Sequence, residues 1–418
     1  MKKNHFYILL ILFILSCINF LYIVWFFEIN GYLPPPFFYD VTDTFNDFYN
    51  TLYWSIHDGI YDVWGSVYPP INFIFLQIYQ FLFMGEILEM WSPSVIRGSE
   101  ARSIMPLLLI YALSLVMAVR ISFKHIVDFK TQFILFFIFM LSPAFLFAVE
   151  RGNLIILCIP VLSWYIFTKN QISRALALSI LFNLKPYFVI FYIFLLISRK
   201  THHKNKDLLF LSPIFGLIIF LFSGLLINEP FYLMPLNLLG FAANSALLSP
   251  AEALTFPSSI AAFGYLRGLV TEFKIAPIVG HIVKLILYVY LINTLVLVYN
   301  KKINFEELAI LSIIFITNFS TSTGGYSLLY YIPVLALLYG KRDWTIFGII
   351  IICIYIGLWD MIPIYNYSGG DSIAYLSGEV VKVSPYMSFG SILRPIANFV
   401  VLVLFFYRLK KRYPNEAI

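Results

Sequence analysis

The chain has 418 residues, of which 61% are hydrophobic and 12% charged, and its mean hydropathy is +0.85. Soluble proteins carry about 25% charged residues, so this composition excludes a cytosolic globular enzyme, a disordered chain and a disulfide-stapled secreted domain. It predicts an all-α polytopic membrane protein that lies in a lipid bilayer. The net charge of +6 is small and evenly spread along the chain, so we expect no nucleic-acid partner.

The basic residues predict which side of the membrane each segment occupies. An apolar run from about Tyr7 to Phe27 follows Lys2 and Lys3, and we interpret it as a retained first span that begins in the cytoplasm. Later clusters at the ends of apolar runs, together with these two lysines, hold 19 of the 28 Lys and Arg residues. If all the clusters are cytoplasmic, the rest of the chain holds 9 basic and 16 acidic residues, and both termini are cytoplasmic.

This topology predicts one integral-membrane domain, 1–418, with about 12 transmembrane helices. The predicted spans are roughly 7–27, 104–122, 131–149, 154–168, 174–184, 187–198, 207–227, 277–299, 306–319, 327–340, 344–364 and 389–407. Several of them are shorter than the roughly 20 residues that an upright helix needs, so we expect those to be tilted or broken.

The long connections, 28–103 and 228–276, both fall on the outer side. No cytoplasmic connection is long enough to fold into a nucleotide-binding domain. We therefore expect any chemistry at the extracytoplasmic face of the cell (inner or plasma) membrane, where nucleotides are absent.

The first outer segment is acidic. Between Glu28 and Pro70 there are six Asp or Glu residues and no Lys or Arg. Asp40 or Thr42 is a plausible N-cap of a helix, and one polar stripe follows at helical spacing: Asp43, Asn46, Asp47 and Asn50. The functional interpretation is a general base with a second acidic or orienting group. The alternative is a solvated acidic face on an interfacial helix.

The largely apolar stretch 71–84 then follows Tyr68-Pro69-Pro70. Its 14 residues suit a re-entrant or interfacial helix better than a span. The alternative is an ordinary short span.

Two basic residues interrupt later apolar runs. Lys185, followed by a proline, stands about midway between Arg174 and Arg199, which predicts two short helices with a lysine at their outer junction. Such a lysine suits a phosphate group, and the alternative is snorkelling to the interface. Arg151 ends another run beside Glu150, facing an anionic lipid headgroup or simply pairing within a turn.

The order of these features resembles a known superfamily. An Asp-x-x-x-Asp-Phe-Tyr stretch precedes Tyr61-Asp62 and Tyr68-Pro69-Pro70, and Arg151-Gly152-Asn153 precedes Leu184-Lys185-Pro186-Tyr187. This order is similar to that of the GT-C integral-membrane glycosyltransferases, most closely the polyprenyl-phosphate-dependent enzymes of glycosyltransferase family 87. The resemblance covers roughly residues 1–200, and the remainder only by hydropathy.

The resemblance implies a GT-C-like bundle whose first outer loop carries interfacial helices and a catalytic aspartate, Asp43 or Asp47. It implies transfer of a sugar with inversion, and we expect Lys185 and Arg151 to stabilise the departing donor phosphate. We expect substrate contacts from three further residues, Tyr68, Asn153 and Arg267. No residue pattern in the sequence requires a metal or a cofactor, although a carboxylate pair could hold a metal ion. Related enzymes can place a histidine in the late outer turn, and 320–326 has none.

The expected activity is therefore that of a cell-envelope hexosyltransferase acting in polysaccharide biosynthesis. It would move a single sugar, a hexose or pentose and most readily a mannose-like one, from polyprenyl phosphate to a surface glycan or glycolipid. Two alternatives remain open: an O-antigen or capsule polymerase, and a polytopic transporter of lipid-linked sugars. The polymerase would be expected to show arginines in large outer loops, and the transporter polar residues spread along several spans.

Overall fold

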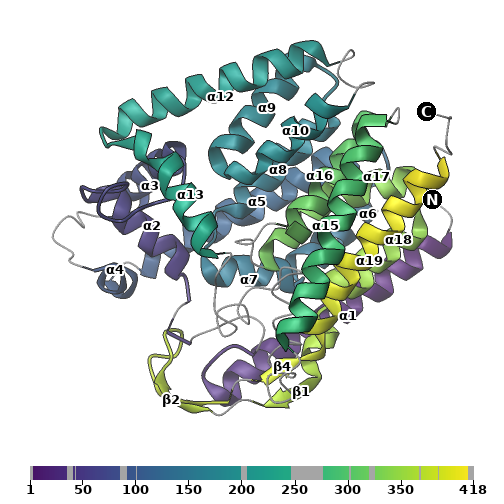
Figure 1. The fold of residues 1–418 in the computed structure, drawn as a ribbon. Helices are drawn as coiled ribbons and strands as arrows, with labels where there is room; N and C mark the ends of the chain where they lie inside the picture. Colours follow the sequence, from purple (N-terminus) through teal and green to yellow (C-terminus); the bar gives the residue numbers. More distant parts are fainter. Residues whose placement is uncertain are drawn as a thin grey trace.

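The computed structural model describes residues 3–34, 41–42, 44–84, 92–99, 101–198, 205–245, 276–300, 303–319, 325–366, 369–384 and 386–412. These residues are mainly helical, and the start of the first helix, Lys3–Asn30, lies near the end of the last helix, Phe389–Arg412, at one side of the bundle (Figure 1).

Among the residues that the structure describes, five helical segments are long and apolar enough to cross a membrane. They are α1 (Lys3–Asn30), α5 (Ile104–Phe123), α12 (Lys206–Ile227), α19 (Phe389–Arg412) and the continuous segment of α18 (Trp344–Ile349), η6 (Ile350–Tyr355) and η7 (Gly357–Met361). A sixth candidate is the pair α6 (Phe129–Met140) and α7 (Pro143–Arg151), which is bent by 55°. The prediction of a helical membrane protein is confirmed at this level, whereas the count of about 12 spans and the GT-C bundle stay predictions.

Outside the first outer segment, all the remaining helices except the two within 231–245, which belong to the predicted outer loop 228–276, lie in predicted spans, and most of them are too short to cross a membrane alone. They are α8 (Ile155–Phe167), α9 (Gln171–Leu184), η2 (Pro186–Phe188) with α10 (Val189–Ile197), η3 (Phe231–Leu233) with α13 (Met234–Ser245), α15 (Ala276–Asn300), α16 (Phe305–Phe319) and η5 (Gly325–Tyr330) with α17 (Tyr331–Gly340). The 14 residues of α9 rise only about 21 Å, less than the ~30 Å of bilayer hydrocarbon.

The predicted first outer segment holds three short helices: α2 (Asn46–Ile56), α3 (Pro70–Phe83) and α4 (Pro93–Ser99), the last followed by η1 (Ala101–Ser103). Helix α3 has the expected short length and packs against α2 and α12. The predicted helix start at Asp40 or Thr42 is wrong, because α2 begins at Asn46 after Phe45, whose φ of 60° is left-handed. Asp40 and Asp43 lie outside the described residues.

The connection between the predicted spans 344–364 and 389–407 contains two small antiparallel sheets. Strand β1 (Pro363–Asn366) pairs with β4 (Tyr386–Ser388), and β2 (Gly370–Ile373) pairs with β3 (Val380–Val383). The connection after β2 contacts the segment before α2, because the amide of Tyr375 donates to the carbonyl of Val41 at 3.0 Å. These strands therefore cover the segment that leads into α2.

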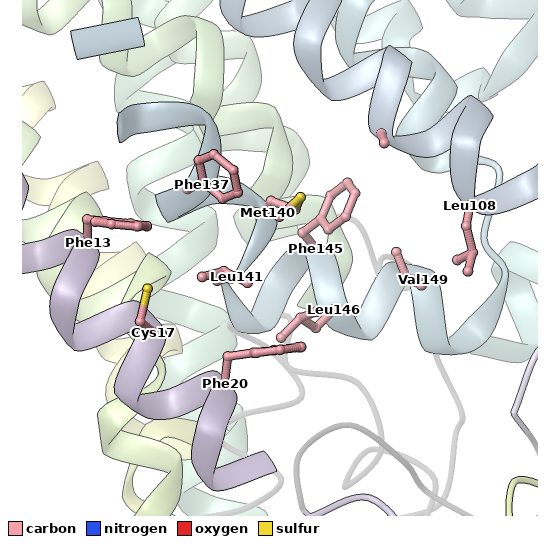
Figure 2. A pocket seen from close by; sticks show the side chains of 11 residues that line it. Phe13, Cys17, Phe20, Leu108, Phe137, Met140, Leu141, Phe145, Leu146 and Val149 are labelled. Carbon is pink, nitrogen blue, oxygen red and sulfur yellow. The ribbon is translucent and has the colours of Figure 1, made fainter. Parts of the chain in front are cut away.

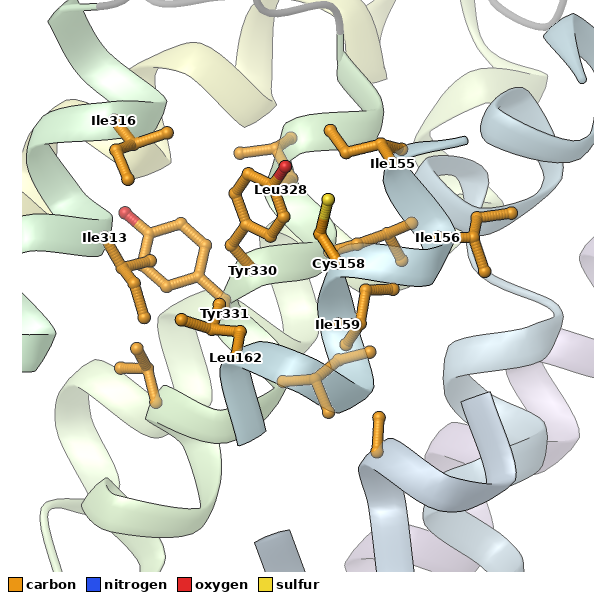
Figure 3. Close-up of a cluster of buried hydrophobic side chains, with 14 of the residues drawn as sticks. Ile155, Ile156, Cys158, Ile159, Leu162, Ile313, Ile316, Leu328, Tyr330 and Tyr331 are labelled. Atoms are coloured by element: carbon orange, nitrogen blue, oxygen red, sulfur yellow. The ribbon is translucent and has the colours of Figure 1, made fainter. Parts of the chain in front are cut away.

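The core is apolar and continuous across the bundle. Figure 3 shows part of it, where α8, α16 and the η5–α17 junction meet around Cys158 and Tyr330. Cys17, Cys158 and Cys353 are free, and Cys158 is buried in this core.

Charged groups gather near the ends of α17 and α19. Lys341 pairs with Glu306 at 2.9 Å, and Arg408 and Arg412 of α19 pair with acids at the starts of α18 and α16. Another ion pair is different, because Asp360 and Arg394 are both nearly inaccessible and join η7 to α19.

Candidate active site

The carboxylate of Asp47 is held by two side chains from a distant turn. Arg151 donates from Nη2 to Oδ1 at 2.6 Å, and Asn153 donates from Nδ2 to Oδ2 at 2.8 Å. The structure thus brings together three of the residues that the sequence analysis selected separately. The Asp47 side chain keeps 23% of its surface exposed, so the carboxylate is fixed in place and still accessible.

The backbone explains how this contact forms. Helix α7 ends at Gly152, whose φ of +66° is left-handed and favours glycine. A Cβ at this position would lie 2.7 Å from the Cβ of Phe48, so the turn sits directly against α2. The amide of Phe45 also donates to the carbonyl of Glu150 at 2.6 Å. The start of α2 is therefore docked on the turn that presents Arg151 and Asn153.

Asn153 connects this turn to the next helix as well. Its Oδ1 accepts from the amide of Ile155 at 3.0 Å, while its Nδ2 faces Asp47. The two contacts fix which way the amide points. Asn153 is accordingly a positioning group for Asp47, with its acceptor atom already used.

Lys185 lies in the turn between α9 and η2, outside the helices on either side, and is buried. Its Nζ is 4.2 Å from the ring centroid of Tyr68, a cation–π contact. Burial lowers the pKa of the Lys185 ammonium to about 8, and the nearby Asp47 carboxylate opposes that shift. The predicted helix break at Lys185 is confirmed, its location on the outer side stays a prediction, and the lysine shares one electrostatic environment with Asp47.

Tyr68 completes the group from the segment before α3. Burial first, and the Asp47 carboxylate second, raise the pKa of its phenol well above the usual value, so the hydroxyl stays protonated and able to donate. Its carbonyl accepts from the hydroxyl of Tyr61 at 3.0 Å, which fixes the backbone before Pro69.

Asn72 is a site residue that sequence reasoning missed. Its Nδ2 donates to three carbonyls, those of Pro69 at 3.0 Å, Asn183 at 3.2 Å and Leu184 at 3.3 Å. It therefore clamps the Tyr68 segment to the end of α9, where Lys185 lies. The available signal was an Asn in the first turn of a largely apolar helix.

A second missed feature is the pair Tyr187 and Tyr330, whose hydroxyls lie 2.6 Å apart. Tyr187 follows Lys185 by two residues, and Tyr330 comes from the end of η5. This contact joins the turn that contains Lys185 to η5, in the C-terminal half of the chain.

An apolar cleft of about 460 Å³ runs along α7 between α1, α5 and α6 (Figure 2). Only apolar side chains and sulfur atoms line it, among them Phe13 and Cys17 of α1, Leu108 of α5, and Leu146 and Val149 of α7. Arg151 follows Val149 by two residues on the same helix, about 3 Å along its axis. The cleft and the polar group therefore share α7.

Two predicted site residues, Asp43 and Arg267, lie outside the described residues. Within the described ranges, no three His, Cys, Asp or Glu side chains are grouped so as to hold a metal ion.

No family model matches the chain, and no curated protein or solved structure shows significant similarity to it. The resemblance to GT-C glycosyltransferases thus rests on the residues quoted from the sequence.

Proposed function

We propose that the protein is a membrane glycosyltransferase that moves one sugar from a polyprenyl-phosphate donor to a glycan or glycolipid acceptor, with inversion. The observation that carries this proposal is the convergence of Asp47, Arg151 and Lys185. One exposed carboxylate and two cations, drawn from three separate segments, meet in largely apolar surroundings.

Asp47 is the general base of this proposal. A carboxylate has about four lone-pair sites, and Arg151 and Asn153 use two of them. Because the Asp47 side chain keeps 23% of its surface exposed, the remaining sites are available to accept the proton of an acceptor hydroxyl. As the proton moves to Asp47, the hydroxyl oxygen bonds to the anomeric carbon of the sugar.

Arg151 and Lys185 act on the leaving group. The bond between the anomeric carbon and the phosphate oxygen breaks, and its electron pair stays on polyprenyl phosphate. Because negative charge grows on that oxygen, two fixed cations stabilise the transition state more than the ground state. A single displacement of this kind inverts the anomeric centre.

The apolar cleft supports a lipid-linked donor over a nucleotide sugar. A prenyl chain lying between α1 and α7 would bring its phosphate to the end of α7, where Arg151 lies. A nucleotide would find no polar lining in this cleft.

The position of the polar groups supports an enzyme over a transporter. Asp47, Arg151, Asn153, Lys185 and Tyr68 gather around the starts of α2, α3 and α8 and the end of α9. We place this end on the extracytoplasmic face. Cysteines introduced at Asp58 and His203 should then be labelled from opposite sides of the membrane.

The experiment that tests the proposal is a donor assay with the purified full-length protein in lipid nanodiscs. Synthetic polyprenyl-phosphate mannose is offered in parallel with a nucleotide sugar, and released polyprenyl phosphate and transferred sugar are measured. We expect turnover of the lipid donor alone. Turnover of the nucleotide sugar alone would overturn the proposal.

A further inference from the structure

Four aromatic side chains gather at the end of α2 and in the turn after it: Tyr53, Trp54, His57 and Trp64, here termed the aromatic patch. Tyr53 stacks on His57 with ring centroids 4.0 Å apart, and Trp64 stacks on Trp54 at 6.3 Å and 19°. Trp64 also meets Tyr53 edge-on at 5.6 Å. Trp64 remains 40% exposed, so the patch is open on one side.

The backbone of this turn is held from the neighbouring segment. The amide of Gly59 donates to Oε1 of Glu229 at 3.1 Å. Asn237 donates from Nδ2 to the carbonyls of Tyr61 at 2.8 Å and Ser66 at 3.2 Å. The aromatic patch is therefore preorganised, which lowers the entropic cost of binding a ligand there.

The patch continues the helix face that carries Asp47. Trp54 follows Asp47 by seven residues, so the two side chains lie within about 20° of each other around the axis. They are separated by roughly 10 Å along it. A ligand group at the Asp47 carboxylate that extends along α2 would reach Trp54 and its stacked partner Trp64.

The charges beside the patch are negative. Asp58 and Asp62 are exposed next to it, and between Glu28 and Pro70 the sequence has no Lys or Arg. Carboxylates repel phosphate, so this side disfavours both the anionic donor and anionic lipid headgroups. Arg151 and Lys185, the two cations of the site, come from other segments.

We propose that the aromatic patch binds the acceptor, and that the acceptor is a neutral oligosaccharide of at least two sugar units. Aromatic rings pack against the apolar faces of sugar rings, and the adjacent carboxylates accept hydrogen bonds from hydroxyls. The terminal sugar presents its hydroxyl to Asp47, and the following sugars lie along α2 toward Trp54 and Trp64. This assignment rests on the proposed function for the reaction, but its binding component is independent of turnover.

A binding experiment tests the patch directly. Full-length protein in nanodiscs is applied to an array of neutral mono- to hexasaccharides, with Trp64→Ala and Trp54→Ala beside the wild type. Trp25→Ala is the matched control, because Trp25 is 59% exposed on α1, away from the patch. We expect binding of at least one neutral oligosaccharide, weakened about tenfold or more by each patch variant and unchanged by Trp25→Ala.

Trp64→Tyr is a second control, which distinguishes the loss of a binding ring from misfolding. It keeps an aromatic ring and should retain most of the binding. No binding by the wild type, or equal binding by wild type and patch variants, would overturn the assignment. An effect of the patch variants on membrane insertion without any effect on array binding would identify the patch as an interfacial anchor and would also overturn it.

Acceptor kinetics separate this proposal from the reaction itself. With the lipid donor, Trp64→Ala should raise KM for an array-positive oligosaccharide about tenfold, whereas the control Trp25→Ala should leave that KM unchanged. Donor turnover without array binding would contradict the acceptor assignment alone. Array binding without donor turnover would contradict the proposed reaction alone.

Discussion

Arg151 donates to Asp47 across 104 residues of sequence, from Nη2 to Oδ1 at 2.6 Å. This contact joins the end of α7 to the first turn of α2. In the proposed reaction Arg151 has two tasks, to hold Asp47 and to face the donor phosphate.

The two tasks give Arg151→Lys and Arg151→Ala distinct outcomes. Lysine keeps the charge but loses the planar fork of the guanidinium. We expect Arg151→Lys to lower kcat about tenfold with donor KM little changed, and Arg151→Ala to lower kcat by about 10²-fold and raise donor KM. Steady-state kinetics with the lipid donor measure both. Equal effects of the two variants on both constants would contradict the double role.

In the proposed reaction, loss of the charge of Lys185 lowers the activity at alkaline pH. Its pKa of about 8 means that the ammonium form, which binds phosphate, is lost as the pH rises through 8. We expect donor kcat/KM to fall above about pH 8 in the wild type. Lys185→Arg should keep part of the activity and move this fall to higher pH, because a guanidinium stays protonated. The test is the pH profile of both proteins, and an unchanged profile in Lys185→Arg would assign the fall to another group.

Gly152 should be costly to replace. Gly152→Ala forces a left-handed φ on alanine, at about 1–2 kcal/mol, and brings its Cβ within 2.7 Å of the Phe48 Cβ. Gly378→Ala is the matched control, since Gly378 has a φ of +71° but no heavy atom within 4 Å of the added Cβ. We expect the larger loss of thermal stability in Gly152→Ala, together with loss of transfer. Equal losses of stability would show that α2 is not docked tightly on this turn.

The buried pair of Asp360 and Arg394 is expected to stabilise the fold rather than the reaction. Asp360→Asn leaves the guanidinium buried against a neutral amide, which should cost about 3–5 kcal/mol. Lys341→Met removes one partner of the exposed pair with Glu306 and should cost at most about 1 kcal/mol. Denaturant unfolding in detergent compares the two variants, and similar midpoints would contradict the difference assigned to burial.

Local features of the site could be predicted from the sequence. The proline after Lys185 broke the helix there, and the short apolar stretch after Pro69-Pro70 became the short helix α3. The turn at Gly152 follows from a glycine that ends an apolar run. Each of these depends on residues within a few positions of one another, where backbone preferences decide the outcome.

The pairing of these pieces could not be predicted. Hydropathy does not tell which polar side chains contact one another in the folded chain. It therefore cannot decide between Asp43 and Asp47 as the base, and it does not predict the contacts of Asn72. The predicted helix start is too early, because the left-handed backbone of Phe45 delays the start of α2 to Asn46. The small sheets were missed because their strands have only three or four residues each.

The central claim is that the carboxylate at position 47 takes the acceptor proton, and an exchange of two side chains tests it most directly. Asp47→Asn alone also disturbs the contact with Asn153, so it is compared with the double variant Asp47→Asn/Asn153→Asp, which restores one amide facing one carboxylate. Asp43→Asn is run in parallel, because Asp43 is the other candidate base.

Transfer from the synthetic polyprenyl-phosphate sugar is measured for all three variants. We expect Asp47→Asn to lose about 10²–10⁴-fold in rate, and the double variant to regain stability but not activity. Recovery of full transfer by the double variant, or loss of transfer in Asp43→Asn with full activity in Asp47→Asn, would contradict the assignment of Asp47 as the base.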